Sequence, residues 1–239
     1  RYLLAGTSSR DHGLPLSTNI APATVTESWT VPVGSDFGYF TAGGAPSPYY
    51  STVDRIDFNN DTAVAATKSP TLVATRGAAS VNSTTFGYSV AGATEDAPTG
   101  YKTSTVSRLN FAGDTSTQVS VANYPVAAGG ITGATGNTDF GYISGGYTPA
   151  LLSSVYRMDY SSDSIAASPK GPLTSSVYRN AAAGNQSFGY AGGGATGNGG
   201  PYVSTVERVE YSNDGVTASP KGPLTSAQGY SAAGGNGDF

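Results

Sequence analysis

The chain has 239 residues, 12% of them charged, with 12 Lys and Arg against 16 Asp and Glu and a net charge of −4. This acidic balance excludes the basic surface that nucleic acids require, and no run approaches the roughly 20 apolar residues of a membrane helix. The absence of cysteine excludes disulfides, and a single histidine excludes a His/Cys metal centre.

The first residues indicate an interrupted repeat. Residue 1 is Arg and not Met, which indicates a chain that is processed, tagged or an excerpt of a longer one. Residues 2–6 read Tyr-Leu-Leu-Ala-Gly, which is typical of a short strand ending in glycine. Residues 2–39 are too few for four strands with their loops, so we expect only part of one sheet here.

A tripeptide, Phe-Gly-Tyr, then recurs through the chain at residues 37–39, 86–88, 140–142 and 188–190. Its tyrosines follow one another at intervals of 49, 54 and 48 residues. A period near 50 residues, with glycine pairs in each unit, is typical of β-propeller blades.

The unit at 173–223 shows the expected strands most clearly. We expect a first strand over 176–183, a second from 188 to 191, a third over 204–211 and a fourth over 216–219. The intervening Gly, Asn, Asp and Ser residues are typical of turns. Four antiparallel strands of this kind make one blade, so the fold class is all-β, a propeller.

The distribution of side-chain size fits blades that converge on a central axis. Small residues fill the expected first strand, at 181–183, 127–130 and 232–235, where the blades have least room. Aromatic residues end the third strand, farther out, where more volume must be filled; they are Phe58, Phe111, Tyr160 and Tyr211.

The layout resembles the kelch repeat over residues 37 to 239. Arg76 and Arg179 match its first strand, and the glycine pairs at 43–44, 145–146 and 192–193 match the end of its second. The chain departs from kelch in the fourth strand, where kelch has Trp and this chain has Ala or Ser. The repeats are also similar to the kelch-like repeats of virion proteins from marine bacteriophages.

The repeat count predicts a ring of five blades. Four whole units span 37–85, 86–139, 140–187 and 188–236. The fifth, closing blade is shared by 1–36 and the C-terminal strand, whose pairing removes the open sheet edges. If the chain is an excerpt, six or seven blades remain possible.

Two charged series recur with the period. Because a residue repeated in every blade usually builds the blade, we expect the arginines to bridge neighbouring blades, with a ring of anion sites as the alternative; they are Arg55, Arg108, Arg157 and Arg208. The turn aspartates are expected to cap their own turns rather than bind metal; they are Asp61, Asp114, Asp163 and Asp214.

Catalytic constellations are absent from the sequence. His12 is the only histidine and has no nucleophile elbow or partner cluster. Glu95 and Asp96 are adjacent, which suits a solvated loop better than a glycosidase pair. We therefore expect no enzyme activity, no metal and no cofactor.

The loops between the second and third strands vary between units and are rich in Tyr, Gly and Ser. Tyrosine offers a large amphipathic surface at low entropic cost, and loops on a rigid scaffold usually carry binding. The candidate ligand-binding residues are His12, Tyr49, Tyr50, Tyr101, Tyr147 and Tyr202. The alternative is that these tyrosines merely cover the blade edges.

The expected function is that of a non-enzymatic module in a virion or otherwise outside a cell. The leading form, implied by the second resemblance, is a phage decoration, fibre or appendage protein. Its partners would be other virion proteins or a glycan or protein on the host surface. A secreted lectin is the first alternative, and an intracellular kelch propeller that binds proteins is the second.

Overall fold

The computed structural model describes residues 37–43, 49–94, 101–113, 119–121, 123–131, 133–197 and 199–235. The chain divides into two compact units, Arg1–Val31 and Pro32–Phe239, and every described residue belongs to the second. His12, both residues of the Glu95–Asp96 pair and the expected closing pairing between 1–36 and the C-terminal strand lie outside the described residues.

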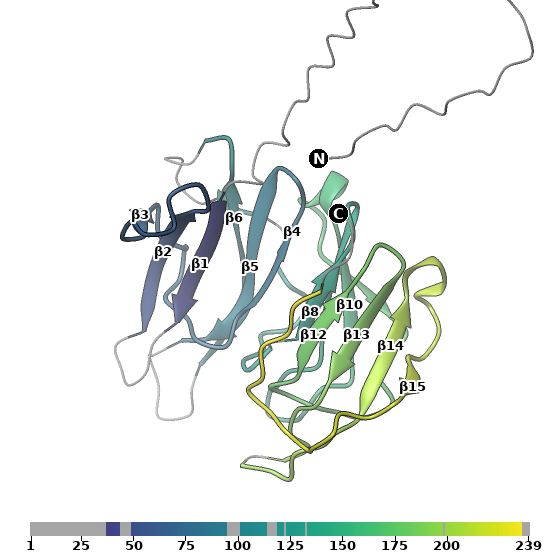
Figure 1. The fold of residues 1–239 in the computed structure, drawn as a ribbon. Coiled ribbons are helices and arrows are strands. Elements are labelled where there is room, and N and C mark those ends of the chain that lie inside the picture. Colours follow the sequence, from purple (N-terminus) through teal and green to yellow (C-terminus); the bar gives the residue numbers. More distant parts are fainter. Residues whose placement is uncertain are drawn as a thin grey trace, which may run out of the picture. The chain divides into compact units, whose positions relative to one another are not determined.

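The described chain is all-β and forms four antiparallel sheets (Figure 1). In each sheet the strands follow chain order, as short hairpin connections dictate. The first sheet has β1 (Phe37–Gly43), β2 (Tyr50–Asp57) and β3 (Ala66–Lys68), and the second has β4 (Ala79–Asn82), β5 (Phe86–Ala93), β6 (Lys102–Asn110) and β7 (Val119–Ser120). The third has β8 (Gly133–Gly136), β9 (Phe140–Ser144), β10 (Val155–Asp159) and β11 (Ser168–Lys170), and the fourth has β12 (Ala181–Gly184), β13 (Phe188–Gly192), β14 (Val206–Glu210) and β15 (Ser219–Lys221).

Helical structure in the described residues is limited to two 3-10 turns, η1 (Tyr160–Ser162) and η2 (Tyr211–Asn213). Each follows the third strand of its sheet, where a tight turn was expected. No helix of the described chain has the length and apolar character needed to cross a membrane.

Three of the four Phe-Gly-Tyr phrases open the second strand of a sheet, in β5, β9 and β13, and the phrase at 37–39 opens β1, the first described strand of its sheet. The preceding strand, β4, β8 or β12, pairs with it across a short turn. The sequence periods that begin at 86, 140 and 188 are therefore offset from the sheets by one strand.

Two expected strand positions need correction. The fourth strand of the last unit is β15 (Ser219–Lys221), not 216–219, and its central Pro220 is tolerated because this is an edge strand. The first strand begins at Ala181 rather than 176, because Arg179 has a positive φ of 60° that interrupts the extended backbone.

One glycine at or just beyond the end of each Phe-Gly-Tyr strand joins its sheet to a following segment of the chain. The amide of this glycine donates to a carbonyl of that segment at 2.7–2.9 Å: Gly43 to Thr75, Gly92 to Ala128, Gly146 to Val177 and Gly194 to Gln228. These glycines have φ between 105° and 115°, a conformation that residues with a Cβ rarely adopt. The repeated glycine is thus required by the backbone contact between sheets.

The core lies between the sheets. The small-residue strand β8 lies against both β4 and β12. Val81, Val90, Ile131 and Ile143 are at most 6% exposed in one apolar cluster. A second cluster contains Tyr142, Val155 and Tyr211 and joins the third sheet to the fourth. Of the three small-residue runs expected in first strands, only 181–183 lies in one, β12, whereas 127–130 precedes β8 and 232–235 belongs to no strand.

Candidate functional site

The recurring arginine and phenylalanine of each sheet stack on one another. The guanidinium carbon lies 4.0–4.5 Å from the centre of the phenylalanine ring in all four sheets: Arg55 over Phe37, Arg108 over Phe86, Arg157 over Phe140 and Arg208 over Phe188. This cation–π contact fixes the arginine so that its N–H groups point from one sheet toward the next.

The recurring tyrosine stacks on an aromatic ring of the following sheet. Ring centres are 5.1 Å apart for Tyr39–Phe111, 5.5 Å for Tyr88–Tyr160 and 4.4 Å for Tyr142–Tyr211, with interplanar angles of 20° or less. The glycine between Phe and Tyr leaves room for this ring, because a Cβ on Gly189 would lie 2.8 Å from the Tyr211 hydroxyl.

Two turn aspartates complete the contact between sheets. Asp163 accepts hydrogen bonds from the Tyr88 hydroxyl at 2.9 Å and from Arg108 Nη1 at 2.7 Å. Asp214 accepts from Tyr142 and Arg157, each at 2.8 Å, and its other oxygen lies 3.3 Å from Lys170 Nζ. We name each tyrosine–arginine pair with its aspartate the intersheet clamp.

The clamps correct the expectation that these aspartates cap their own turns. Asp163 and Asp214 receive donors from the preceding sheet, whereas the cap of the first 3-10 turn is Asp159, which accepts from the Ser161 amide at 2.9 Å. Sequence spacing between Asp163 and its donors, 75 and 55 residues, gave no local signal of the pairing.

Burial within the stacks raises the pKa of the clamp tyrosines. For Tyr88 and Tyr142 the pKa rises mainly by burial, and the hydrogen bond to the carboxylate raises it further. Burial raises the pKa of Tyr211 to about 12. These hydroxyls therefore remain protonated donors at physiological pH, which suits a structural role.

The contacts at the two ends of the described array differ from those of the two clamps. In the fourth sheet Arg208 stacks on Phe188, but the buried Nε of Arg208 and the Tyr190 hydroxyl have no acceptor among the described residues. In the first sheet Phe58, which corresponds to Tyr160 and Tyr211, is 59% exposed. The acceptor expected for Arg55, Asp114, lies outside the described residues.

The candidate tyrosines lie at the end of the sheets where the second strand leads into the third. Tyr50, Tyr101 and Tyr202 are 51%, 62% and 39% exposed. Tyr49 and Tyr147 are half-buried under cations, with Arg76 at 5.1 Å and Lys102 at 4.8 Å from their ring centres. His12 lies outside the described residues. We call this end of the sheets the loop rim.

A further cluster on the loop rim was not among the predicted binding residues. The Arg179 guanidinium lies 4.3 Å from the centre of the Tyr178 ring and 4.2 Å from that of Tyr230. Tyr202 lies beside it, with ring carbons 2.8 Å from the position of a Cβ on Gly229. The sequence does contain a signal for this cluster, because Arg179 occupies the position that is glycine in two earlier units, at Gly77 and Gly130.

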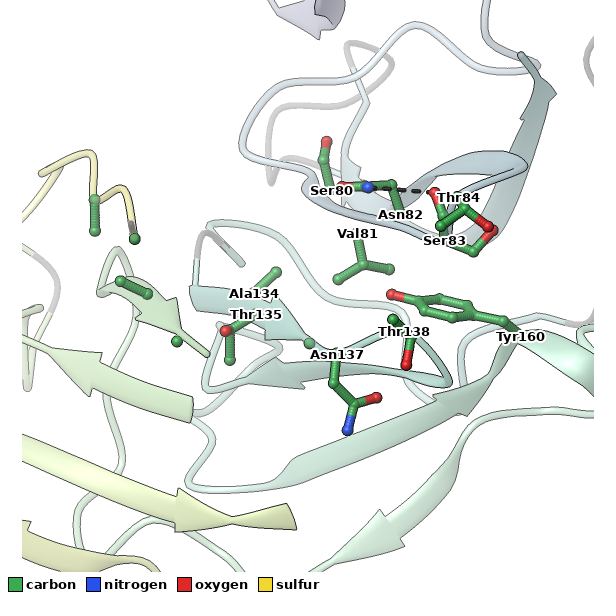
Figure 2. Close-up of a pocket in the computed structure, with 15 residues that line it drawn as sticks. Ser80, Val81, Asn82, Ser83, Thr84, Ala134, Thr135, Asn137, Thr138 and Tyr160 are labelled. Atoms are coloured by element: carbon green, nitrogen blue, oxygen red, sulfur yellow. Dashed lines mark hydrogen bonds between the residues drawn. The ribbon is translucent and has the colours of Figure 1, made fainter. Parts of the chain in front are cut away.

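The opposite ends of the first strands line an open cavity of about 390 Å³ (Figure 2). Its lining is uncharged, with hydroxyl and amide groups from Ser80, Asn82, Thr84, Thr135, Asn137, Thr138 and Tyr160. No three His, Cys, Asp or Glu side chains gather as a metal site within the described ranges. The cavity is thus suited to water or a small neutral polar molecule.

Comparisons with known proteins identify the arrangement of the chain but no family. No protein-family model and no curated protein matches the sequence. Among solved structures, 163 chains match, so the arrangement is a recurrent one. One is described as the structure of YjhT, with a TM-score of 0.69 and 11% sequence identity over 84% of this chain and 71% of that one. At this identity the likeness concerns the fold alone.

Proposed function

We propose that the chain is a non-enzymatic binding module on a β-propeller scaffold, carried by a virion or otherwise outside a cell. The four antiparallel sheets and their serial clamps support the propeller. In this proposal residues 1–36 and the C-terminal strand complete a fifth blade.

One observation carries the binding role. Arg108 and Arg157, two of the recurring arginines, are engaged between sheets and so serve the scaffold. The tyrosines of the loop rim do not recur at fixed positions, and Tyr101 and Tyr202 leave much of their rings exposed. Exposed tyrosine on loops held by a rigid scaffold favours recognition of a partner.

For the virion form we propose attachment to a host-surface glycan or protein, or assembly with other virion proteins. The similarity of the repeats to those of virion proteins supports this form. Proteomic mass spectrometry of the purified native source tests it. Co-purification with capsid or tail proteins at a fixed ratio is the expected result, and a lone species of this mass, free of any particle, would contradict it.

A secreted lectin is the second candidate. The loop rim favours it because aromatic rings and basic side chains lie next to each other there. Tyrosine rings lie beside basic side chains in three sheets, at Tyr49, Tyr147 and Tyr178. Such amphipathic surfaces suit sugars, which present apolar faces and polar edges. A lectin would bind soluble glycans in the absence of any virion protein.

A further inference from the structure

We propose that Arg179, which contacts the rings of Tyr178 and Tyr230, binds the carboxylate or sulfate of an acidic saccharide. This inference rests on the binding role proposed for the loop rim and specifies its ligand. The guanidinium carbon lies 4.3 and 4.2 Å from the centres of the two tyrosine rings. The guanidinium carries a planar fork of N–H groups that matches planar or tetrahedral anions.

Within the described residues, the Arg179 guanidinium has no carboxylate partner of the kind that Arg108 and Arg157 have. Arg108 and Arg157 donate to Asp163 and Asp214. In the described part of the chain, by contrast, the contacts of the Arg179 guanidinium are the two aromatic rings. A half-buried guanidinium has lost part of its hydration, so an anion at its edge gains charge-assisted hydrogen bonds.

Two residues of this cluster have a positive φ at a position where two earlier units have glycine. Arg179 and Tyr230 both have φ of 60°, whereas the corresponding positions of two earlier units hold Gly77 and Gly130 with φ of 59° and 60°. A residue with a Cβ is less stable in this conformation than glycine is. Such strain is retained mainly at functional positions, and here it brings an arginine and a tyrosine into contact.

Hydrogen bonds hold the backbone and one ring of the cluster in place. The Arg179 amide donates to the Gly130 carbonyl, and the Tyr230 amide donates to the Arg179 carbonyl, each at 3.0 Å. Tyr178 is 4% exposed, and its hydroxyl accepts from the Gly199 amide at 3.3 Å. The arginine is therefore preorganised, which lowers the entropic cost of binding.

The exposed rings beside the arginine provide the rest of the site. Tyr230 is 65% exposed and Tyr202 is 39% exposed. A pyranose whose anionic group meets Arg179 can place its apolar face on either ring.

The test measures binding of two matched pairs of probes to the full chain by calorimetry. The pairs are oligogalacturonate with its methyl ester, and κ-carrageenan oligosaccharide with its desulfated form. We expect at least one acidic member to bind about tenfold more tightly than its neutral counterpart. Arg179→Gly, which introduces the residue of the corresponding positions, should remove this preference without lowering the melting temperature.

The control is Arg76→Ala, which removes another ring-stacked cation of the same rim and should change affinity by no more than about threefold. Equal binding of acidic and neutral members, an unchanged preference in Arg179→Gly, or no binding of either acidic probe would overturn the proposal. Any of these three results could occur while the broader binding role still holds. That role would be supported separately by binding of neutral glycans, or by co-purification of the chain with virion proteins at a fixed ratio.

Discussion

The Tyr142 hydroxyl donates a hydrogen bond of 2.8 Å to the carboxylate of Asp214, which belongs to the next sheet. Arg157 donates to the same oxygen at 2.8 Å. Tyr88, Arg108 and Asp163 repeat the arrangement one sheet earlier. The repeated sequence phrase is therefore explained by contacts between successive sheets, which a single sheet could not make alone.

Removing a clamp carboxylate should destabilise the fold. Asp214→Ala leaves Arg157 and Lys170 without their carboxylate and Tyr142 without its acceptor. Because the Arg157 side chain is 27% exposed, we expect a loss of about 2–3 kcal/mol, less than for a fully buried pair. Urea unfolding measures it. Asp139→Ala, at an exposed turn, should stay within about 0.5 kcal/mol; equal losses in both variants would contradict the clamp.

The hydroxyl of the repeated tyrosine should contribute to the free energy of unfolding only where a carboxylate accepts its hydrogen bond. Tyr142→Phe keeps the stack on Tyr211 and loses the hydrogen bond to Asp214, which should cost about 1.5 kcal/mol. The matched variant is Tyr190→Phe, in the same motif of the fourth sheet, where no described acceptor meets the hydroxyl. Its unfolding free energy should barely change. A similar loss in Tyr190→Phe would contradict this expectation, because it would show that the Tyr190 hydroxyl also donates to an acceptor.

The glycine of the repeated tripeptide should not accept a methyl group. A Cβ on Gly141 would lie 2.8 Å from Val81 Cγ2 and 2.9 Å from the Tyr160 hydroxyl. Gly141→Ala should therefore cost about 1–3 kcal/mol by overpacking. Gly215→Ala is the control, since nothing lies within 4 Å of its Cβ position. Thermal unfolding should separate the two, and equal melting temperatures would refute the tight packing.

Stability should fall in alkali because the stacked tyrosines resist ionisation. Burial raises the pKa of Tyr211 to about 12 and also raises that of Tyr142 and Tyr160. An unfolded tyrosine ionises near pH 10, so stability is complete below about pH 10 and is lost as pH rises toward the folded values. The urea midpoint across this range measures the loss. Tyr142→Phe with Tyr160→Phe should flatten the profile, and a wild-type midpoint constant to about pH 12 would contradict the burial.

Much of the fold could be predicted from the sequence because its units repeat locally. The Phe-Gly-Tyr strands and the glycine pairs are contiguous, so turn chemistry and strand patterning placed them. The clamp partners could not be predicted, since Tyr142 and Asp214 are 72 residues apart and meet only after two sheets have formed. The fourth strand lies later than the expected 216–219 because an edge strand tolerates proline, so that Pro220 lies inside β15.

The candidate site was predicted only in part. Exposure of Tyr101 and Tyr202 followed from their polar, variable loops. Arg179 was noted only as a match to a repeat. Its role depends on a positive φ and on two rings that come from either side of it in the chain. No local pattern encodes that arrangement, although the replacement of glycine by arginine at this position was visible in the sequence.

The most direct test of the binding role compares variants on one array of glycans and bacterial surface polysaccharides. The wild-type chain is measured beside Tyr101→Ala with Tyr202→Ala on the loop rim, and beside Tyr142→Phe in a clamp. We predict that the rim variant loses array binding while it keeps the wild-type melting temperature, and that the clamp variant loses stability while it keeps binding. Unchanged binding in the rim variant would contradict the central claim that these exposed tyrosines recognise the partner.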